Sequence, residues 1–429
     1  MMAVYEPAED RSTASGVIAF YAVMALFPIF LIYQSLGALG VIPLFIGGGF
    51  GATGAVFSLL MTIPFLMMLL FRRPRRQAYF ILSFVILWVG VTLIIIVNIT
   101  FPPPYLVNSA ALGEVTRLHM GSMVYWYVLF LSGLFWGHFS RRYAQVIIFV
   151  FVFISIIMLA NAQLIKMLFH PGNTEGASTY QQIARSIAII GMLALAYVRS
   201  WAATFIIYIL LIASLFFIGA RSEFAGTLAL APIVFLLSCK DIRARVILIS
   251  LLILCGTIFL LVFAHQIPEW MSGSRQGGLL ELSDDSSWLA RQRLLEIGVQ
   301  AIMDSPFFGD FAGEITHGGV GGYIHNILSA WRQYGIIPFL LFIGLLVYGT
   351  VDAADAVFRR GENDSIAKLS LYFNLTSLLL LLAAKGVFWP VVAFAWGLSA
   401  QMAGRPLGAR SIMRPSRRKV RAVEAGLLS

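Results

Sequence analysis

The chain has 429 residues, of which 59% are hydrophobic and only 12% are charged. Soluble domains carry about 25% charged residues, so this composition excludes a soluble protein and indicates an integral membrane protein with several spans. The net charge of +10 does not indicate a nucleic-acid partner, because membrane proteins concentrate Lys and Arg in their cytoplasmic loops.

Apolar runs long enough to cross a membrane, which takes roughly 17–25 helical residues, recur from one end of the chain to the other. They predict an all-α integral membrane protein. We expect about twelve transmembrane helices, at residues 16–36, 51–71, 79–98, 122–139, 143–163, 186–198, 202–220, 225–239, 246–264, 327–349, 369–384 and 387–403.

The basic residues of the loops predict how these spans are oriented. Lys or Arg residues follow the second, fourth, sixth, eighth, tenth and twelfth spans, which places all of these residues on one side. That side is cytoplasmic by the positive-inside rule, and both termini lie there. The chain then divides into spans one to nine (1–264), a large periplasmic loop containing short helices (265–326), spans ten to twelve (327–403), and a basic cytoplasmic tail (404–429).

Nine basic residues fall on the outer side instead. For any single one of them, snorkelling to the membrane interface is the simpler interpretation, and we apply it to Lys385. Arg221 differs, because it lies in a tight turn between two apolar spans, IGARSEF, where Glu223 offsets its charge only in part. Guanidinium groups match phosphate oxygens, so a cluster of outer arginines would suit an anionic lipid diphosphate. The nine are Arg117, Lys166, Arg185, Arg221, Arg275, Arg291, Arg293, Arg332 and Lys385.

One helix is predicted within the large outer loop, at residues 284–305, with Pro306 ending it. At 100° per residue, Arg291 falls within the apolar arc of this helix. Arg293 falls on the opposite side, where Glu296 can pair with it. We therefore expect Arg291 to face the body of the protein, where it needs an anionic partner, and Arg293 to face solvent.

His325 stands just before the tenth predicted span, at its outer mouth. A neutral imidazole at that place can take a proton from a hydroxyl group near neutral pH. The alternative is an interfacial histidine at a helix start, with Asn326 as the N-cap. His317, in a glycine-rich loop, is a weaker candidate. The outer histidines have no acidic or cysteine neighbours at metal-ligand spacing, so the sequence predicts no metal site.

Three motifs occur in order along the chain: GARSEF with Arg221, RQRLLEIGVQAIMDSPFFGDF with Arg291, and HNILSAWRQYGIIPFLLF with His325. The first is similar to a Ser-Arg turn, the second to an arginine-led helix that runs into a Pro-x-x-Gly turn, and the third to a His-Asn-x-x-Leu…Gly pattern. Together they resemble the O-antigen ligase and Wzy-type polymerase superfamily of bacterial envelope glycan enzymes. The chain departs from that pattern at Ala220, where the family has serine, and at Leu295, where it has tryptophan.

The resemblance implies an inverting glycosyl transfer, without metal or cofactor, from an undecaprenyl-diphosphate-linked glycan donor to a glycan acceptor. It implies that Arg221 and Arg291 hold the diphosphate and that His325 activates the acceptor hydroxyl. Asn326, Arg293 and Arg332 are further substrate-binding candidates. The site would face the periplasm from the bacterial inner membrane, and chain-length or export proteins are possible partners.

Three functions stay open at this point. A polymerase would join lipid-linked repeat units into exopolysaccharide, capsule or O-antigen, and we favour it. A ligase would move finished glycan onto lipid A–core with the same three residues. A transporter or flippase would perform no chemistry, but it would need ionisable residues deep within several spans, whereas the polar groups here gather on one outer face.

Overall fold

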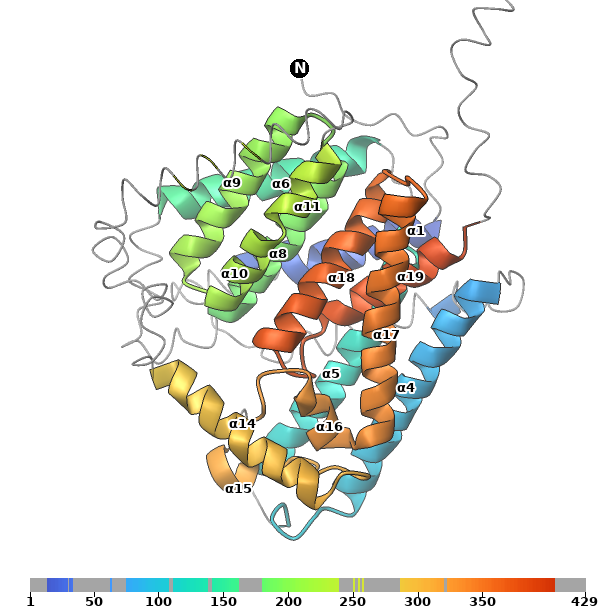
Figure 1. The fold of residues 1–429 in the computed structure, drawn as a ribbon, viewed down its shortest axis with the longest axis vertical. Coiled ribbons are helices and arrows are strands. Elements are labelled where there is room, and N and C mark those ends of the chain that lie inside the picture. The colour runs from blue at the N-terminus through green and yellow to red at the C-terminus, as the bar shows by residue number, and fades with distance from the viewer. Residues whose placement is uncertain are drawn as a thin grey trace, which may run out of the picture.

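A computed structural model of the chain describes residues 14–29, 31–33, 62–63, 75–107, 111–137, 141–161, 180–238, 250, 254, 257, 286–319 and 322–405. Within these residues the regular elements are helices, as the apolar composition predicts (Figure 1). In chain order they are α1 (Ala14–Met24), η1 (Ala25–Ile29), α4 (Arg75–Thr100), α5 (Ala111–Leu134), α6 (Arg141–Ala160), α8 (Tyr180–Tyr197), α9 (Trp201–Ile218), α10 (Arg221–Ala229), α11 (Ala231–Ser238), α14 (Ser286–Asp304), α15 (Ile315–Gly318), α16 (Leu328–Tyr334), α17 (Ile336–Ala354), η3 (Asp355–Arg359), α18 (Ser365–Ala383) and α19 (Val391–Ala403).

The membrane character of the fold rests on the length and hydropathy of these helices. Six of the described helical segments are long and apolar enough to cross a membrane. The pair α10 and α11, bent by 41°, makes a seventh if it forms one broken span. The predicted spans at 51–71 and 246–264 lie almost entirely outside the described residues, so the count of twelve stays a prediction.

Two predicted outer loops are shorter than expected. The sequence predicts irregular structure at 99–121, and the consecutive prolines do keep residues 101–107 out of regular helix. However, α5 already begins at Ala111. Likewise α8 begins at Tyr180, so Arg185 lies inside a helix and not in a loop.

The tenth predicted span is divided by Gly335. This residue has φ 80°, in the region that glycine tolerates best, and it separates α16 from α17. A Cβ atom on Gly335 would collide with the carbonyl oxygen of Phe307. The apolar segment therefore begins at Ile336, while α16 lies with the polar elements that precede it.

The helices form two groups with α18 and α19 between them. On one side, α8 packs on α6 and α9, and α10 packs on α8, α9 and α18. On the other side, α5 packs along α19 and α4, and α17 packs on α18, α19 and α4. The polar elements α14, α15 and α16 gather at one end of the bundle, where α14 packs on α16 and α16 on α17 (Figure 1).

Candidate functional site

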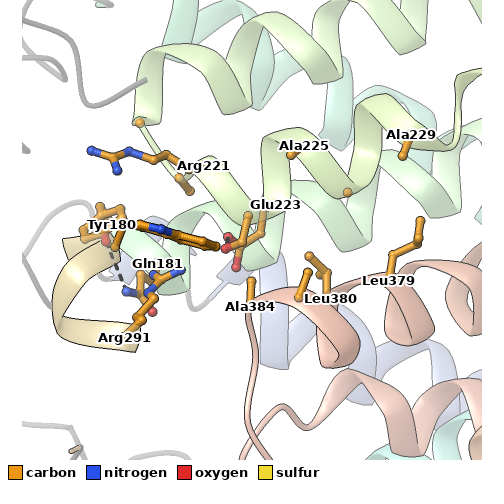
Figure 2. Close-up of a pocket in the computed structure, with 16 residues that line it drawn as sticks. Tyr180, Gln181, Arg221, Glu223, Ala225, Ala229, Arg291, Leu379, Leu380 and Ala384 are labelled. Atoms are coloured by element: carbon orange, nitrogen blue, oxygen red, sulfur yellow. Dashed lines mark hydrogen bonds between the residues drawn. The ribbon is translucent and has the colours of Figure 1, made fainter. Parts of the chain in front are cut away.

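A cavity of about 350 Å³ lies between α8, α10, α14 and α18. Arg221 and Arg291 both line it, although they come from different helices. Figure 2 shows the two side chains on opposite sides of the cavity mouth, with Tyr180 and Gln181 between them. The two arginines thus line one cavity, and that they act on one ligand stays a prediction.

The position of Arg221 is set by the chain reversal between α9 and α10. Gly219 ends α9 with φ 80°, and its N–H donates to the carbonyl oxygens of Leu215 and Phe216 at 3.3 and 3.1 Å. The turn predicted around Arg221 thus consists of Gly219 and Ala220. Arg221 itself begins α10, so its guanidinium extends from a helix N-terminus, where the helix dipole also favours anions.

Arg291 is held by the packed face of α14. A Cβ on Gly298 would clash with the side chain of Ile324, so the backbone of α14 lies directly against the loop that precedes α16. Arg291 stands about two helical turns before Gly298 and shares its face. It is half-buried, whereas Arg293 is exposed. The separation of the two arginines that helical phase predicted is confirmed.

His325 lies in the loop against which α14 packs. Its ring centroid is 5.0 Å from that of Tyr323. Burial, followed by the positive charges of Arg291 and Lys385, lowers the pKa of His325 to about 4. The imidazole is therefore neutral near pH 7 and able to accept a proton. His325 does not line the cavity itself. It is connected to the cavity through Arg291, which lines the cavity and whose positive charge helps to lower the pKa of His325.

The other three predicted substrate-binding residues do not line the cavity. The Oδ1 atom of Asn326 accepts a hydrogen bond from the N–H of Leu328 at 2.9 Å, a local turn just before α16, whose N-cap is Ile327. Arg332 is 1% exposed and forms an ion pair with Asp310 at 3.2 Å. Arg293 faces away on α14. We therefore leave Asn326, Arg293 and Arg332 out of the site.

Several residues that were not predicted to belong to the site lie at or next to the cavity. Glu223, a lining residue, forms a buried ion pair with Lys385, with 2.8 Å between Oε1 and Nζ. Lys385 is 9% exposed, so the snorkelling interpretation is wrong for it. The guanidinium carbon of Arg185 lies 4.9 Å from the ring centroid of Trp389, and Nζ of Lys385 lies 5.2 Å from it.

The charges around the cavity are unbalanced. Burial and the positive charges of Arg185 and Arg291 lower the pKa of Lys385, while Glu223 opposes them. Within the described residues, no carboxylate forms an ion pair with Arg185 or Arg291. Among the described residues, the cations Arg185, Arg291 and Lys385 therefore outnumber the one carboxylate that pairs with any of them, Glu223. A half-buried group with this excess of positive charge favours an anionic ligand.

The opposite end of the cavity is apolar. Small residues of α10 and aliphatic residues of α18 form its walls, with Leu379 and Leu380 facing Ala225 and Ala229 (Figure 2). Gly226 brings the backbone of α10 close to α18, since a Cβ there would lie 2.9 Å from the side chain of Leu380. The cavity thus combines a cationic mouth with an apolar interior, as an amphiphilic anion requires.

Comparison with known proteins yields no matching family model, no matching curated protein and no matching solved structure. Within the described part of the chain, no group of three or more His, Cys, Asp or Glu side chains is placed to hold a metal ion.

Proposed function

We propose that this protein transfers a glycan from an undecaprenyl-diphosphate-linked donor at the periplasmic face of a bacterial inner membrane. We further propose that it acts as a polymerase of lipid-linked repeat units, in the O-antigen ligase and Wzy-type polymerase superfamily, with the twelve-span topology described above. The observation that carries the proposal is the cavity itself, because Arg221 and Arg291 meet at its mouth while its interior is apolar.

The proposed reaction requires the protein mainly to supply positive charge for the leaving diphosphate and to position the acceptor, the donor and the base. The acceptor hydroxyl oxygen attacks the anomeric carbon of the donor sugar, and the bond from that carbon to the phosphate oxygen breaks. The electron pair leaves with the diphosphate, whose growing negative charge Arg221 and Arg291 stabilise. The acceptor proton passes to the imidazole of His325. Attack from the side opposite to the diphosphate inverts the anomeric centre.

The surroundings of His325 suit this proton transfer. Its lowered pKa keeps the imidazole unprotonated before the donor binds. A bound diphosphate offsets the positive charges of Arg291 and Lys385, which raises the proton affinity of His325 when the proton must be taken up. The donor would therefore activate the base that its own reaction requires.

The apolar wall supports a lipid donor over a soluble nucleotide sugar. Ala225, Ala229, Leu379 and Leu380 offer no hydrogen-bond partner for a sugar or a base, but they match the hydrocarbon of a polyprenyl chain. The α10–α11 pair is a candidate broken span, so this wall would lie at the depth where the lipid tail begins.

The test of the site is alanine substitution followed by gel analysis of glycan in the host. We expect Arg221→Ala, Arg291→Ala and His325→Ala, expressed at normal levels, to abolish long-chain polymer. The matched control is Arg293→Ala, which removes the same side chain from the exposed face of the same helix and should leave the polymer intact. Full-length polymer in all three site variants would contradict the proposal.

The test of the acceptor is deletion of the gene. Loss of a polymerase leaves single repeat units on the lipid acceptor, as we expect. Loss of a ligase leaves long chains on undecaprenyl diphosphate, and that outcome would reassign the protein to the ligase class. Unchanged cell-surface glycan of every type would exclude both.

A further inference from the structure

Five of the seven residues between α18 and α19, Lys-Gly-Val-Phe-Trp at 385–389, contact α8, α10 or the chain around His325. We call this segment the connector. Its contacts reach α10 on one side and the His325 loop on the other, so it links α10 to the loop against which α14 packs.

The contact with α10 is the ion pair between Lys385 and Glu223. The two charged atoms lie 2.8 Å apart, and Glu223 is only 1% exposed. Glu223 stands two residues after Arg221, in the first turn of the same helix. The ion pair therefore connects Lys385 to the first turn of α10, which also carries Arg221.

The contacts with the His325 loop come from the next three residues of the connector. A Cβ on Gly386 would lie 2.9 Å from the ring of Tyr323 and 3.0 Å from the carbonyl oxygen of Ile324. The N–H of Val387 donates to Oγ of Ser329 at 2.6 Å. The ring of Phe388 lies 4.9 Å from that of Tyr323. These contacts hold the loop immediately before His325 and the first turn of α16 after it.

The same loop supports Arg291, because Ile324 fills the hollow that Gly298 leaves in α14. The last connector residue, Trp389, lies against Arg185 of α8 and against Lys385 itself. The connector thus joins the helix that begins at Arg221 to the elements that carry Arg291 and His325. Because α10 packs on α8, α9 and α18, whereas α14 packs on α16, the helices that carry the two arginines do not pack closely on each other.

We propose that Lys385 is a positioning residue, whose ion pair with Glu223 fixes Arg221 relative to Arg291 and His325. What the positioned groups do rests on the proposed function, but the positioning itself does not. Removing one partner of a buried ion pair leaves an uncompensated charge, whereas removing both charges is often tolerated. A double variant therefore separates this role from direct contact between Lys385 and the ligand.

The first experiment measures the distance between α10 and α14 with spin labels. The labels are placed at Leu228→Cys and Met303→Cys, both exposed, in the full chain carrying Cys239→Ser and Cys255→Ser. We expect Lys385→Met and Glu223→Gln, each alone, to broaden or shift the distance distribution. The double variant should restore it. An unchanged distribution in folded Lys385→Met would overturn the proposal, as would a double variant that stays as broad as the single ones.

The second experiment measures glycan transfer by purified protein from a synthetic polyprenyl-diphosphate oligosaccharide. Misplacement of reacting groups by about 1 Å costs on the order of 100-fold in rate, so Lys385→Met should lose that much and the double variant should recover most of it. A double variant with normal label distances but no recovery would mean that Lys385 or Glu223 acts on the ligand directly, and positioning would be rejected as the cause of the lost rate. If the unmodified protein transfers nothing, the proposed function fails, while the label distances still decide the positioning role.

Discussion

Arg291 lies close enough to His325 to lower its pKa, although the two residues belong to different elements of the outer part of the chain. The packing of Gly298 on Ile324 brings them together, since it places α14 against the His325 loop. The proposed base is therefore controlled by the residue that is proposed to bind the donor.

This relationship predicts how transfer depends on pH. With a pKa of about 4, His325 is unprotonated at neutral pH and loses its capacity to accept a proton only as the pH falls toward that value. Lys385 contributes to the low pKa, so replacing its charge moves the pKa up. We expect the acid limb of kcat/KM to shift to higher pH in the Glu223→Gln/Lys385→Met double variant. A limb that stays in place or shifts to lower pH would exclude His325 as the group that titrates.

The apolar end of the cavity predicts a chain-length effect. Ala229→Phe should fill the space between α10 and α18 and raise KM for a donor with a full polyprenyl chain by on the order of tenfold. A donor with only one or two isoprene units should be much less affected. Leu228→Phe is the control, because Leu228 is 48% exposed and does not line the cavity. Equal effects of Ala229→Phe on both donors would show that the lipid tail lies elsewhere.

The tight packing around Gly335 predicts that alanine substitutions at two glycines near one another in the chain differ in their effect on stability. Gly335→Ala forces a side chain into φ 80° and against the carbonyl oxygen of Phe307, which should destabilise the protein by at least about 2 kcal/mol. Gly344→Ala, within α17, meets nothing within 4 Å and should be neutral or stabilising. Thermal unfolding of the purified protein in detergent measures both. Similar Tm values for the two variants would contradict the tight fit at Gly335.

The ion pair between Arg332 and Asp310 predicts a stability role for Arg332. Arg332→Met should lower the free energy of unfolding by about 3 kcal/mol. This value is near the lower end of the range for a broken buried ion pair, because Asp310 is 27% exposed. Arg359→Met is the matched control, since Arg359 is 85% exposed and its pair with Asp355 should contribute less than about 1 kcal/mol. Transfer by the folded fraction of Arg332→Met should persist. A stable but inactive variant would return Arg332 to the substrate site.

Local patterns in the sequence were sufficient for several parts of the site. Helical phase separated Arg291 from Arg293, and the order of apolar runs located Arg221 next to a chain reversal. These inferences succeed because hydropathy and periodicity act over one or two helical turns. The same patterns misjudged Lys385, because one charge between two apolar runs is as typical of an interfacial residue as of a buried ion pair.

The sequence by itself indicated a helical protein with several apolar segments of membrane-spanning length, and it marked the arginines on its predicted outer side as candidates for binding an anion. Only the tertiary structure decided which side chains come together around the cavity. Glu223 and Lys385, or Arg185 and Trp389, are far apart along the chain, and nothing in either stretch specifies the other. Their contacts arise from the way α8, α10 and α18 pack, which is a property of whole helices and leaves no local signature.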